Sequence, residues 1–194
     1  MNSATVQEPV IAPLSSGDDD ELYEIIDGQR IGLPPIAFQS ALLACRVAHQ
    51  IGSFVDAHDL GFVVTHGLFD LALLADRRRR PKAAYVSYQR WPKDRAIPLT
   101  DNGLDVVPEL VVEVVSPTDR IEELQEKIHD YFQAGVKLVW VVHPVLGVVH
   151  VYESLTAIRG LAPTDELDGG TVLPGFKLPI ATLFRAPIGR GLTS

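Results

Sequence analysis

Residues 108–154 read PELVVEVVSPTDRIEELQEKIHDYFQAGVKLVWVVHPVLGVVHVYES, and this stretch decides the fold. Its first segment, Leu110 to Val115, is apolar and rich in β-branched residues apart from Glu113. Such a continuous run predicts a strand that is covered on both faces. A carboxylate buried there is costly, or takes up a proton, unless it has a partner. We therefore expect a cation, a hydrogen-bond network or a bound metal beside Glu113.

A helix is predicted directly after this strand. Ser116 is a favourable N-cap, with Pro117 at the first helical position and Asp119 at the third, in a pattern that resembles a capping box. Gly135 is the stop signal of the helix. Its predicted buried stripe consists of Ile121, Leu124, Ile128, Tyr131 and Phe132.

An apolar strand resumes over 137–142, and a turn from His143 to Gly147 leads into a further strand over 148–152. The order strand, helix, strand predicts a β-α-β unit with a right-handed parallel crossover. The strand after the turn should be its antiparallel neighbour.

The rest of the chain gives shorter signals. A long amphipathic helix is predicted over 37–60, with Gly61 as its stop signal. The predicted strands are 23–26 and 30–33 around Asp27-Gly28, 62–65 and 68–74 as a hairpin around His66-Gly67, 83–87, and a closing strand near 173–176.

Length and composition predict one globular domain. The 194 residues are 46% hydrophobic, which is enough for a full core. We expect a flexible arm over 1–20, the domain over 21–187 and a tail over 188–194. The single cysteine, Cys45, is expected in the core, and a single cysteine forms no internal disulfide. Since no signal segment opens the sequence either, a cytoplasmic location is expected. No apolar run approaches the roughly 18 residues of a membrane span.

A formal charge of −8 argues against indiscriminate coating of nucleic acid, although a local basic patch can still meet phosphate. The candidate patch consists of Arg77, Arg78, Arg79, Arg80 and Lys82. The alternative, favoured by the usual behaviour of charge runs, is a solvated loop between two strands.

Glu113 and Lys127 are the residues most suited to chemistry. The rise of the strand and that of the helix bring the long Lys127 side chain level with Glu113. A carboxylate that holds a divalent metal, together with an ammonium that stabilises developing charge, suits phosphodiester hydrolysis. The alternative is a structural ion pair with no catalytic role.

Several motifs occur together along the chain: PELVVEVVSPTDR over 108–120, YFQAGV over 131–136, LVWVV over 138–142 with Pro144, and LPGF over 173–176. With these motifs the chain resembles the Uma-two restriction endonucleases of the PD-(D/E)XK nuclease superfamily. Upstream motifs at 23–24, 27–28, 69–71, 86–87 and 91–92 extend the resemblance over about residues 21–185. It implies an α/β fold, a restriction-endonuclease-like mixed β-sheet core flanked by helices, and a DNA endonuclease that uses Mg²⁺ or Mn²⁺.

By this resemblance, Glu113 matches the family's catalytic and metal-binding strand carboxylate. The superfamily's lysine normally follows two residues later, where Val115 stands, so Lys127 on the next helix is taken as its substitute. The other metal ligand is the Asp of a Pro-Asp pair, and here that pair reads Pro81-Lys82. Replacing this carboxylate by an ammonium should strongly weaken a divalent site. We expect Lys82 to pair with Glu113 instead.

Other acids are candidates to compensate for the altered position. Asp70 matches a family position and is the candidate second metal ligand, with Glu24 and Asp76 as alternatives, whereas Gln29 stands where the family often has a glutamate. Two functions stay open: a metal-dependent DNA endonuclease, or a catalytically silent relative that binds nucleic acid or protein through the old cleft. The sequence leaves a homodimer open.

Overall fold

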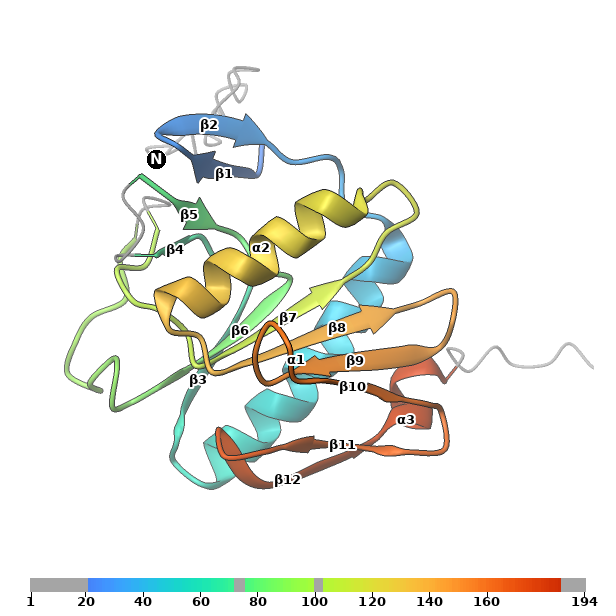
Figure 1. Ribbon diagram of the computed structural model, residues 1–194. Helices are drawn as coiled ribbons and strands as arrows, with labels where there is room; N and C mark the ends of the chain where they lie inside the picture. Colours follow the sequence, from blue (N-terminus) through green and yellow to red (C-terminus); the bar gives the residue numbers. More distant parts are fainter. Residues whose placement is uncertain (1–20, 72–75, 100–102, 186–194) are drawn as a thin grey trace, which may run out of the picture.

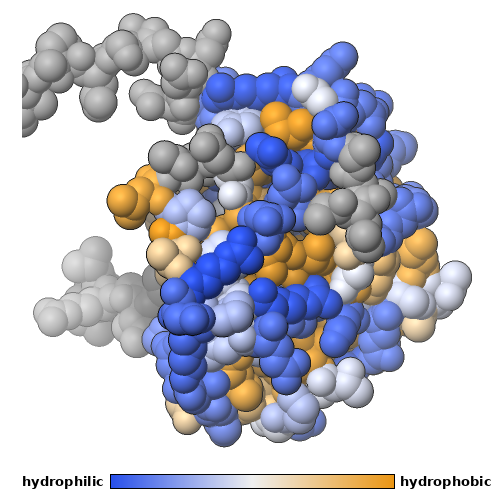
Figure 2. Space-filling model, turned by 90° about the vertical axis from the view of Figure 1, so that its left-hand side faces the viewer, coloured by the Kyte–Doolittle hydropathy of each residue, from blue (hydrophilic) through white to orange (hydrophobic). Residues whose placement is uncertain are grey.

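A computed structural model describes residues 21–71, 76–99 and 103–185. The expected arm over 1–20 and the expected tail over 188–194 lie outside the described residues, as do residues 72–74 of the predicted strand 68–74. Among the described residues, no helix is long and apolar enough to cross a membrane. Figure 2 shows one face of the molecule, which is largely hydrophilic with smaller hydrophobic patches between.

A six-stranded mixed sheet forms the centre of the molecule (Figure 1). Its strand order is β10-β9-β8-β7-β6-β3. The bounds are β3 Gly61–Thr65, β6 Ala83–Ser87, β7 Leu110–Val114, β8 Leu138–His143, β9 Val148–Tyr152 and β10 Ile158–Leu161. The strands β7 and β8 are parallel and all other neighbours antiparallel, which confirms the predicted β-α-β unit and the antiparallel strand after it.

Two helices cover the two faces of this sheet (Figure 1). Helix α1, Phe38–Ala57, packs on one face, and helix α2, Ile121–Ala134, lies on the other. Successive side chains of a strand point to opposite faces, so Val112 and Val114 of β7 join the core beneath α1 while Val111 joins the core beneath α2. The same alternation turns Glu113 toward α2.

A second, smaller sheet lies beside α2 on the same side of the central sheet, with the order β2-β1-β5-β4. Its strands are β1 Tyr23–Ile26, β2 Gln29–Gly32, β4 Phe69–Asp70 and β5 Arg78–Arg79. The predicted hairpin at 23–33 is confirmed, with Asp27 and Gly28 at positive φ in its turn.

The predicted hairpin around His66-Gly67 is wrong. Strand β3 pairs with β6 in the central sheet, whereas β4 pairs with β5 in the second sheet. The local turn signal is real, since His66 has a positive φ, but the chain uses the turn to pass from one sheet to the other.

A third element closes the molecule beside α1. The strands β11, Glu166–Gly169, and β12, Leu173–Pro179, form a two-stranded sheet, followed by the short helix α3, Ile180–Phe184. Leu173, Phe176 and Leu183 complete the core beneath α1.

One boundary of each predicted helix needs correction: the end of α1 and the start of α2. Helix α1 stops at Ala57, and Gly61 instead opens β3, where a Cβ would lie 2.1 Å from the Val86 carbonyl oxygen. Helix α2 begins at Ile121 rather than after Ser116, because Asp119 accepts a hydrogen bond from the Ser116 amide in a separate turn. The end of α2 is as predicted, with Gly135 left-handed at φ 98°.

Two predicted core residues lie at the surface. Ile121, in the first turn of α2, is 70% exposed because the stripe that packs on the sheet begins only at Leu124. Cys45 is exposed on α1, between the buried Ala44 and Val47 on the side of the helix that faces away from the core.

Candidate functional site

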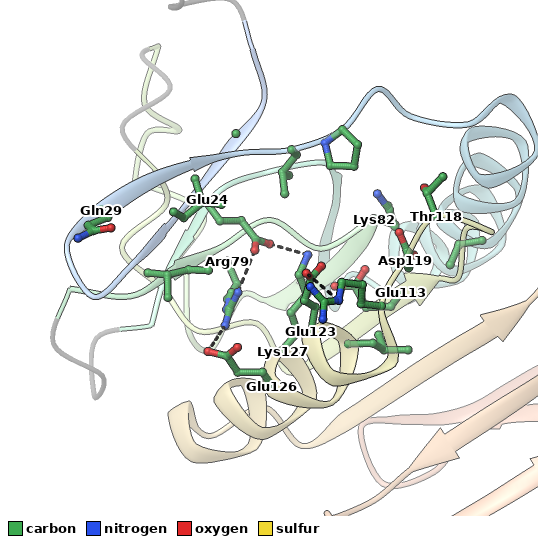
Figure 3. Close-up of a pocket in the computed structure, with 18 of the residues that line it drawn as sticks. Glu24, Gln29, Arg79, Lys82, Glu113, Thr118, Asp119, Glu123, Glu126 and Lys127 are labelled. Carbon is green, nitrogen blue, oxygen red and sulfur yellow. Dashed lines mark hydrogen bonds and ion pairs between the residues drawn. The ribbon is translucent and has the colours of Figure 1, made fainter.

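A cavity of about 500 Å³ lies between the β1–β2 hairpin, the carboxyl end of β7 and the first half of α2 (Figure 3). Charged side chains from several segments line it, and four of them are central to the site: Glu24, Lys82, Glu113 and Lys127. On α2, positions 123, 127 and 131 are spaced by four residues, so they follow one face of the helix. The helix therefore directs Lys127 into the cavity and Tyr131 onto the sheet below it.

Glu113 forms the buried end of the cavity and is 4% exposed. The Tyr131 hydroxyl donates a hydrogen bond of 2.7 Å to its Oε1. Burial raises the pKa of Glu113 above its ordinary value, although the Lys127 charge and the Tyr131 hydrogen bond act in the opposite direction. The partner that a buried carboxylate requires is thus the Tyr131 hydroxyl, and the charge of Lys127 lies nearby.

Glu24 is the second carboxylate of the cavity, 2% exposed on β1. It accepts from Arg79 Nη1 at 3.0 Å, from the Arg80 backbone amide at 2.9 Å, and pairs with Lys127 Nζ at 2.9 Å. Two cations and one amide therefore fix its position.

Lys127 lies between the two carboxylates. It makes its ion pair with Glu24, and the charges of Glu113 and Glu24 raise its pKa even though burial alone would lower it. The structure thus brings Glu113 and Lys127 into one cavity, as the spacing of strand and helix predicts. Their catalytic role stays a prediction.

Lys82 enters the cavity one residue before β6. The register pairs Ala83 with Val112, so its continuation sets Lys82 opposite Glu113. Among the described residues, however, no ion pair joins Lys82 to Glu113, so the direct pairing expected from the sequence is wrong, although the Lys82 charge still acts to lower the pKa of Glu113. Tyr131 satisfies the carboxylate instead, which leaves the Lys82 ammonium available in the cavity.

The four arginines do not form the solvated loop expected from their charge. Arg79 and Arg80 are 2% and 4% exposed, because β5, an inner strand of the second sheet, lies against α2, where Arg79 meets Asp130. Arg77 pairs with Asp27, Glu126 and Asp130, Arg79 with Glu24 and Asp130, and Arg78 with Asp70, while Arg80 donates to the backbone oxygens of Tyr23 and His66. Their contacts are internal, so the structure offers no support for this run as a nucleic-acid-binding patch.

The structure does not bring Asp70 to the cavity. Asp70 lies on β4 and pairs with Arg78 at 3.2 Å, outside the residues that line the cavity, so it is not placed to share a metal with Glu113. Asp76 is exposed beside Gly28 in the turn before β5. Of the compensating acids, only Glu24 reaches the cavity, and Gln29 lines the same wall.

Sequence reasoning missed the support that surrounds Glu24. Asp130 of α2 is 2% exposed and pairs with Arg79 at 2.6 Å and with Arg77 at 2.9 Å. A carboxylate three residues after Lys127 on the same helix, in a chain with a dense arginine run elsewhere, was the available signal. The pairing of Asp130 with Arg77 and Arg79 depends on the packing of β5 against α2, which no local sequence pattern predicts.

The cavity floor does not fit a divalent metal ion. Its two carboxylates, Glu24 and Glu113, face three cations, Arg79, Lys82 and Lys127. Among the described residues there is also no group of three or more His, Cys, Asp or Glu side chains that could hold a metal. Hard divalent cations need several oxygen ligands, and here the Glu24 oxygens are already paired with Arg79 and Lys127 while Lys82 lies opposite Glu113.

A family model described as "Putative restriction endonuclease", Uma2, matches residues 13–181 of the chain. Among solved structures, the chain is similar to "a putative nuclease belonging to DUF820" from Anabaena variabilis ATCC 29413. The TM-score is 0.72 at 18% sequence identity, over 84% of this chain and 89% of that one, so the two share a fold. No curated protein matches the chain.

Proposed function

This chain belongs to the Uma2 family, and on that premise we propose that it is a nuclease-fold protein that binds a DNA phosphodiester in the Glu113 cavity with its metal-dependent cleavage silenced. The observation that carries the proposal is Lys82, which lies in register with Glu113 where the family resemblance implies a metal-binding Asp. The nuclease-like fold supports the nucleic-acid class of the ligand.

The charges of the floor favour an anion. Lys127 and Arg79 are already neutralised by Glu24 and Asp130, whereas among the described residues Lys82 has no carboxylate partner. A lysine ammonium in a partly closed cavity binds a phosphate oxygen through charge-assisted hydrogen bonds. Lys82 is therefore the group that we assign to the phosphodiester.

A metal-dependent DNA endonuclease is the second candidate. It is favoured by the convergence of Glu113, Lys127 and Glu24 in one cavity, since Lys127 Nζ lies 2.9 Å from Glu24. In that case Glu113 and Glu24 would share Mg²⁺ or Mn²⁺, and Lys82 would have to turn away from them.

The experiment compares the unmodified chain with Lys82→Asp. Calorimetric titration with MgCl₂ and MnCl₂, fluorescence anisotropy with labelled DNA, and nicking of plasmid DNA are measured for both. We expect the unmodified chain to bind DNA without tight metal binding or nicking, and Lys82→Asp to gain both metal binding and nicking, because two carboxylates across one cavity attract a divalent ion. Lys82→Asp combined with Glu113→Gln should lose both.

Lys137→Asp is the matched control, because Lys137 is an exposed lysine outside the cavity, at the opposite end of the β7–β8 pair. Lys82→Ala should weaken DNA binding about tenfold, the loss of one charge-assisted contact, and Lys137→Ala should not. Nicking by the unmodified chain that depends on metal and on Glu113 would establish the second candidate. Absence of DNA binding by the unmodified chain would refute the proposal.

A further inference from the structure

The wall of the cavity opposite α2 is an apolar face of the β1–β2 hairpin. Register pairs Glu24 with Ile31 and Ile26 with Gln29, so these four side chains share one face of the hairpin, and all four line the cavity. Leu33 and Pro34, which follow β2, also line the cavity and add to its apolar side. The cavity thus combines a charged floor with an apolar side.

The size of this cavity excludes a stacked duplex. A volume of about 500 Å³ lies within the range of small-molecule sites, and Glu113 at its end is almost wholly buried. A phosphodiester held in a continuous base stack cannot enter such a space without bringing its neighbours. Enzymes that act on buried atoms of DNA meet the same difficulty, and they take single strands or nucleotides turned out of the stack.

The charge around the mouth of the cavity also disfavours a duplex. Asp27, Asp119 and Glu123 line the outer part of the cavity and are exposed, with Arg120 beside them. The backbone of a duplex lying across the mouth would therefore meet like charges, on a protein whose formal charge is −8. One phosphate that passes this rim reaches the Lys82 ammonium on the floor.

We infer that the cavity admits one unpaired nucleotide of a DNA strand, with its phosphate on Lys82 and its base against the hairpin wall at Ile31. This inference rests on the proposed function and names its substrate class. Apolar side chains hold an extruded base by burying its faces, which gives Ile31 a role that its exposure in the free protein does not otherwise explain. Ile31 is 42% exposed on β2, where a base would cover it.

The test measures binding of the full chain, by fluorescence anisotropy at low salt, to three labelled ligands of one sequence. These are a single strand, the blunt duplex, and the duplex with one strand shortened to leave an overhang. Unlabelled dAMP is the competitor that separates a nucleotide within DNA from a free mononucleotide. We expect the single strand and the overhang duplex to bind at least about tenfold more tightly than the blunt duplex, with dAMP a weak competitor.

Ile31→Asp should remove that preference, because it adds a third acid to the wall that receives the base. Ile158→Asp is the matched control, since Ile158 is 51% exposed on a strand, β10, that does not line the cavity. Thermal unfolding checks that both variants fold, and Ile31→Ser replaces Ile31→Asp if the latter does not. The comparison of ligands on the unmodified chain needs no variant.

Equal affinity for the single strand and the blunt duplex, with Lys82-dependent binding retained, would overturn this inference and leave the proposed function standing. Competition by dAMP as strong as that of the single strand would also overturn it, because the ligand would then be a free mononucleotide. No binding of any DNA would instead refute the proposed function itself. A loss of preference in Ile158→Asp equal to that in Ile31→Asp would place the base outside the cavity and overturn the inference.

Discussion

Glu113 shows how a carboxylate is accommodated inside an apolar strand. Its neighbours on β7 are fully buried, and the Tyr131 hydroxyl is its direct hydrogen-bond donor. The sequence identifies Glu113 as the residue that needs a cation, a hydrogen-bond network or a metal beside it, but the specific pairing with Lys82 is wrong, because the contact with Tyr131 depends on where α2 crosses the sheet.

Tyr131→Phe should destabilise the protein by about 1–3 kcal/mol, since it leaves a buried carboxylate oxygen without its donor while the ring still packs. The measurement is urea unfolding followed by circular dichroism. Tyr152→Phe is the control, because Tyr152 is a partly buried tyrosine of the same core and its hydroxyl has no hydrogen bond among the described residues. Equal losses in both variants would mean that the hydrogen bond to Glu113 contributes nothing.

The raised pKa of Glu113 predicts a pH dependence. The folded protein holds this proton more tightly than the unfolded chain, so the stabilisation is complete below the ordinary value of 4.5 and is lost as the pH rises through the folded pKa. Relative to Glu113→Gln, which has no such titration, the unmodified chain should lose free energy of unfolding as the pH rises from 4.5. Unfolding of both proteins is measured up to about pH 8. A difference that grows in favour of the unmodified chain would show that burial does not dominate its pKa.

Helix α2 is the element that joins the two sheets and builds the site. Its inner face gives Lys127 to the cavity, Tyr131 to Glu113 of the central sheet, and Asp130 to Arg79 of the second sheet. Little more than one turn of the helix, residues 127–131, thus couples both buried carboxylates of the cavity to one rigid element.

Asp130→Asn should destabilise the protein by about 3 kcal/mol, because it removes a buried negative charge from Arg79 and leaves that guanidinium with fewer partners. Glu126→Gln is the control. Glu126 pairs with the same two arginines but is half-exposed, so its loss should cost no more than about 1 kcal/mol. Chemical unfolding of both variants measures the difference. A larger cost for Glu126→Gln would show that the network depends on its outer rather than its inner acid.

The elements with strong local signals were predictable, and the pairing of distant elements was not. Continuous apolar runs, helical periodicity and the Gly135 stop define β7, α2 and β8 within a few residues. The turn at His66-Gly67 was also read correctly, yet its two strands belong to different sheets, because β3 finds its partner in β6 across a long separation. The start of α2 was misplaced because Ser116 and Asp119 form their own closed turn.

At the scale of the whole molecule, electrostatics opposes any broad contact with DNA. The chain carries a formal charge of −8, and its arginine run is spent on internal ion pairs. The sequence was enough to predict the fold class, the family and the approach of Glu113 and Lys127 to one cavity. It could not reveal that Arg79 and Arg80 are buried, since a charge run reads as a surface feature unless the tertiary partners are known.

If only one or two phosphates are neutralised in the cavity, the affinity for single-stranded DNA should depend weakly on salt. The slope of log K against log salt should be about −1, compared with about −10 for proteins that cover a long stretch of backbone. Anisotropy titrations over a series of NaCl concentrations give this slope, and Lys82→Ala should flatten it further. A steep slope would indicate a broad basic surface, in conflict with the charge distribution of the described residues.

The two buried carboxylates of the cavity belong to different sheets. Glu24 lies in the second sheet, which contains the β1–β2 hairpin, and Glu113 lies in the central sheet. The distance between Glu24 and Glu113 therefore depends on how the β1–β2 hairpin packs against the rest of the protein, and not on the geometry of a single strand. The outer strand β2 is exposed along its whole length, so its amide protons should exchange with solvent far faster than those of β7. A ligand that bridges both sheets binds only the docked form, and by linkage it should slow exchange in β1 and β2 while leaving β7 unchanged. Amide exchange in β1 and β2 therefore reports binding of a ligand in the cavity, even though these strands need not touch the phosphate of that ligand.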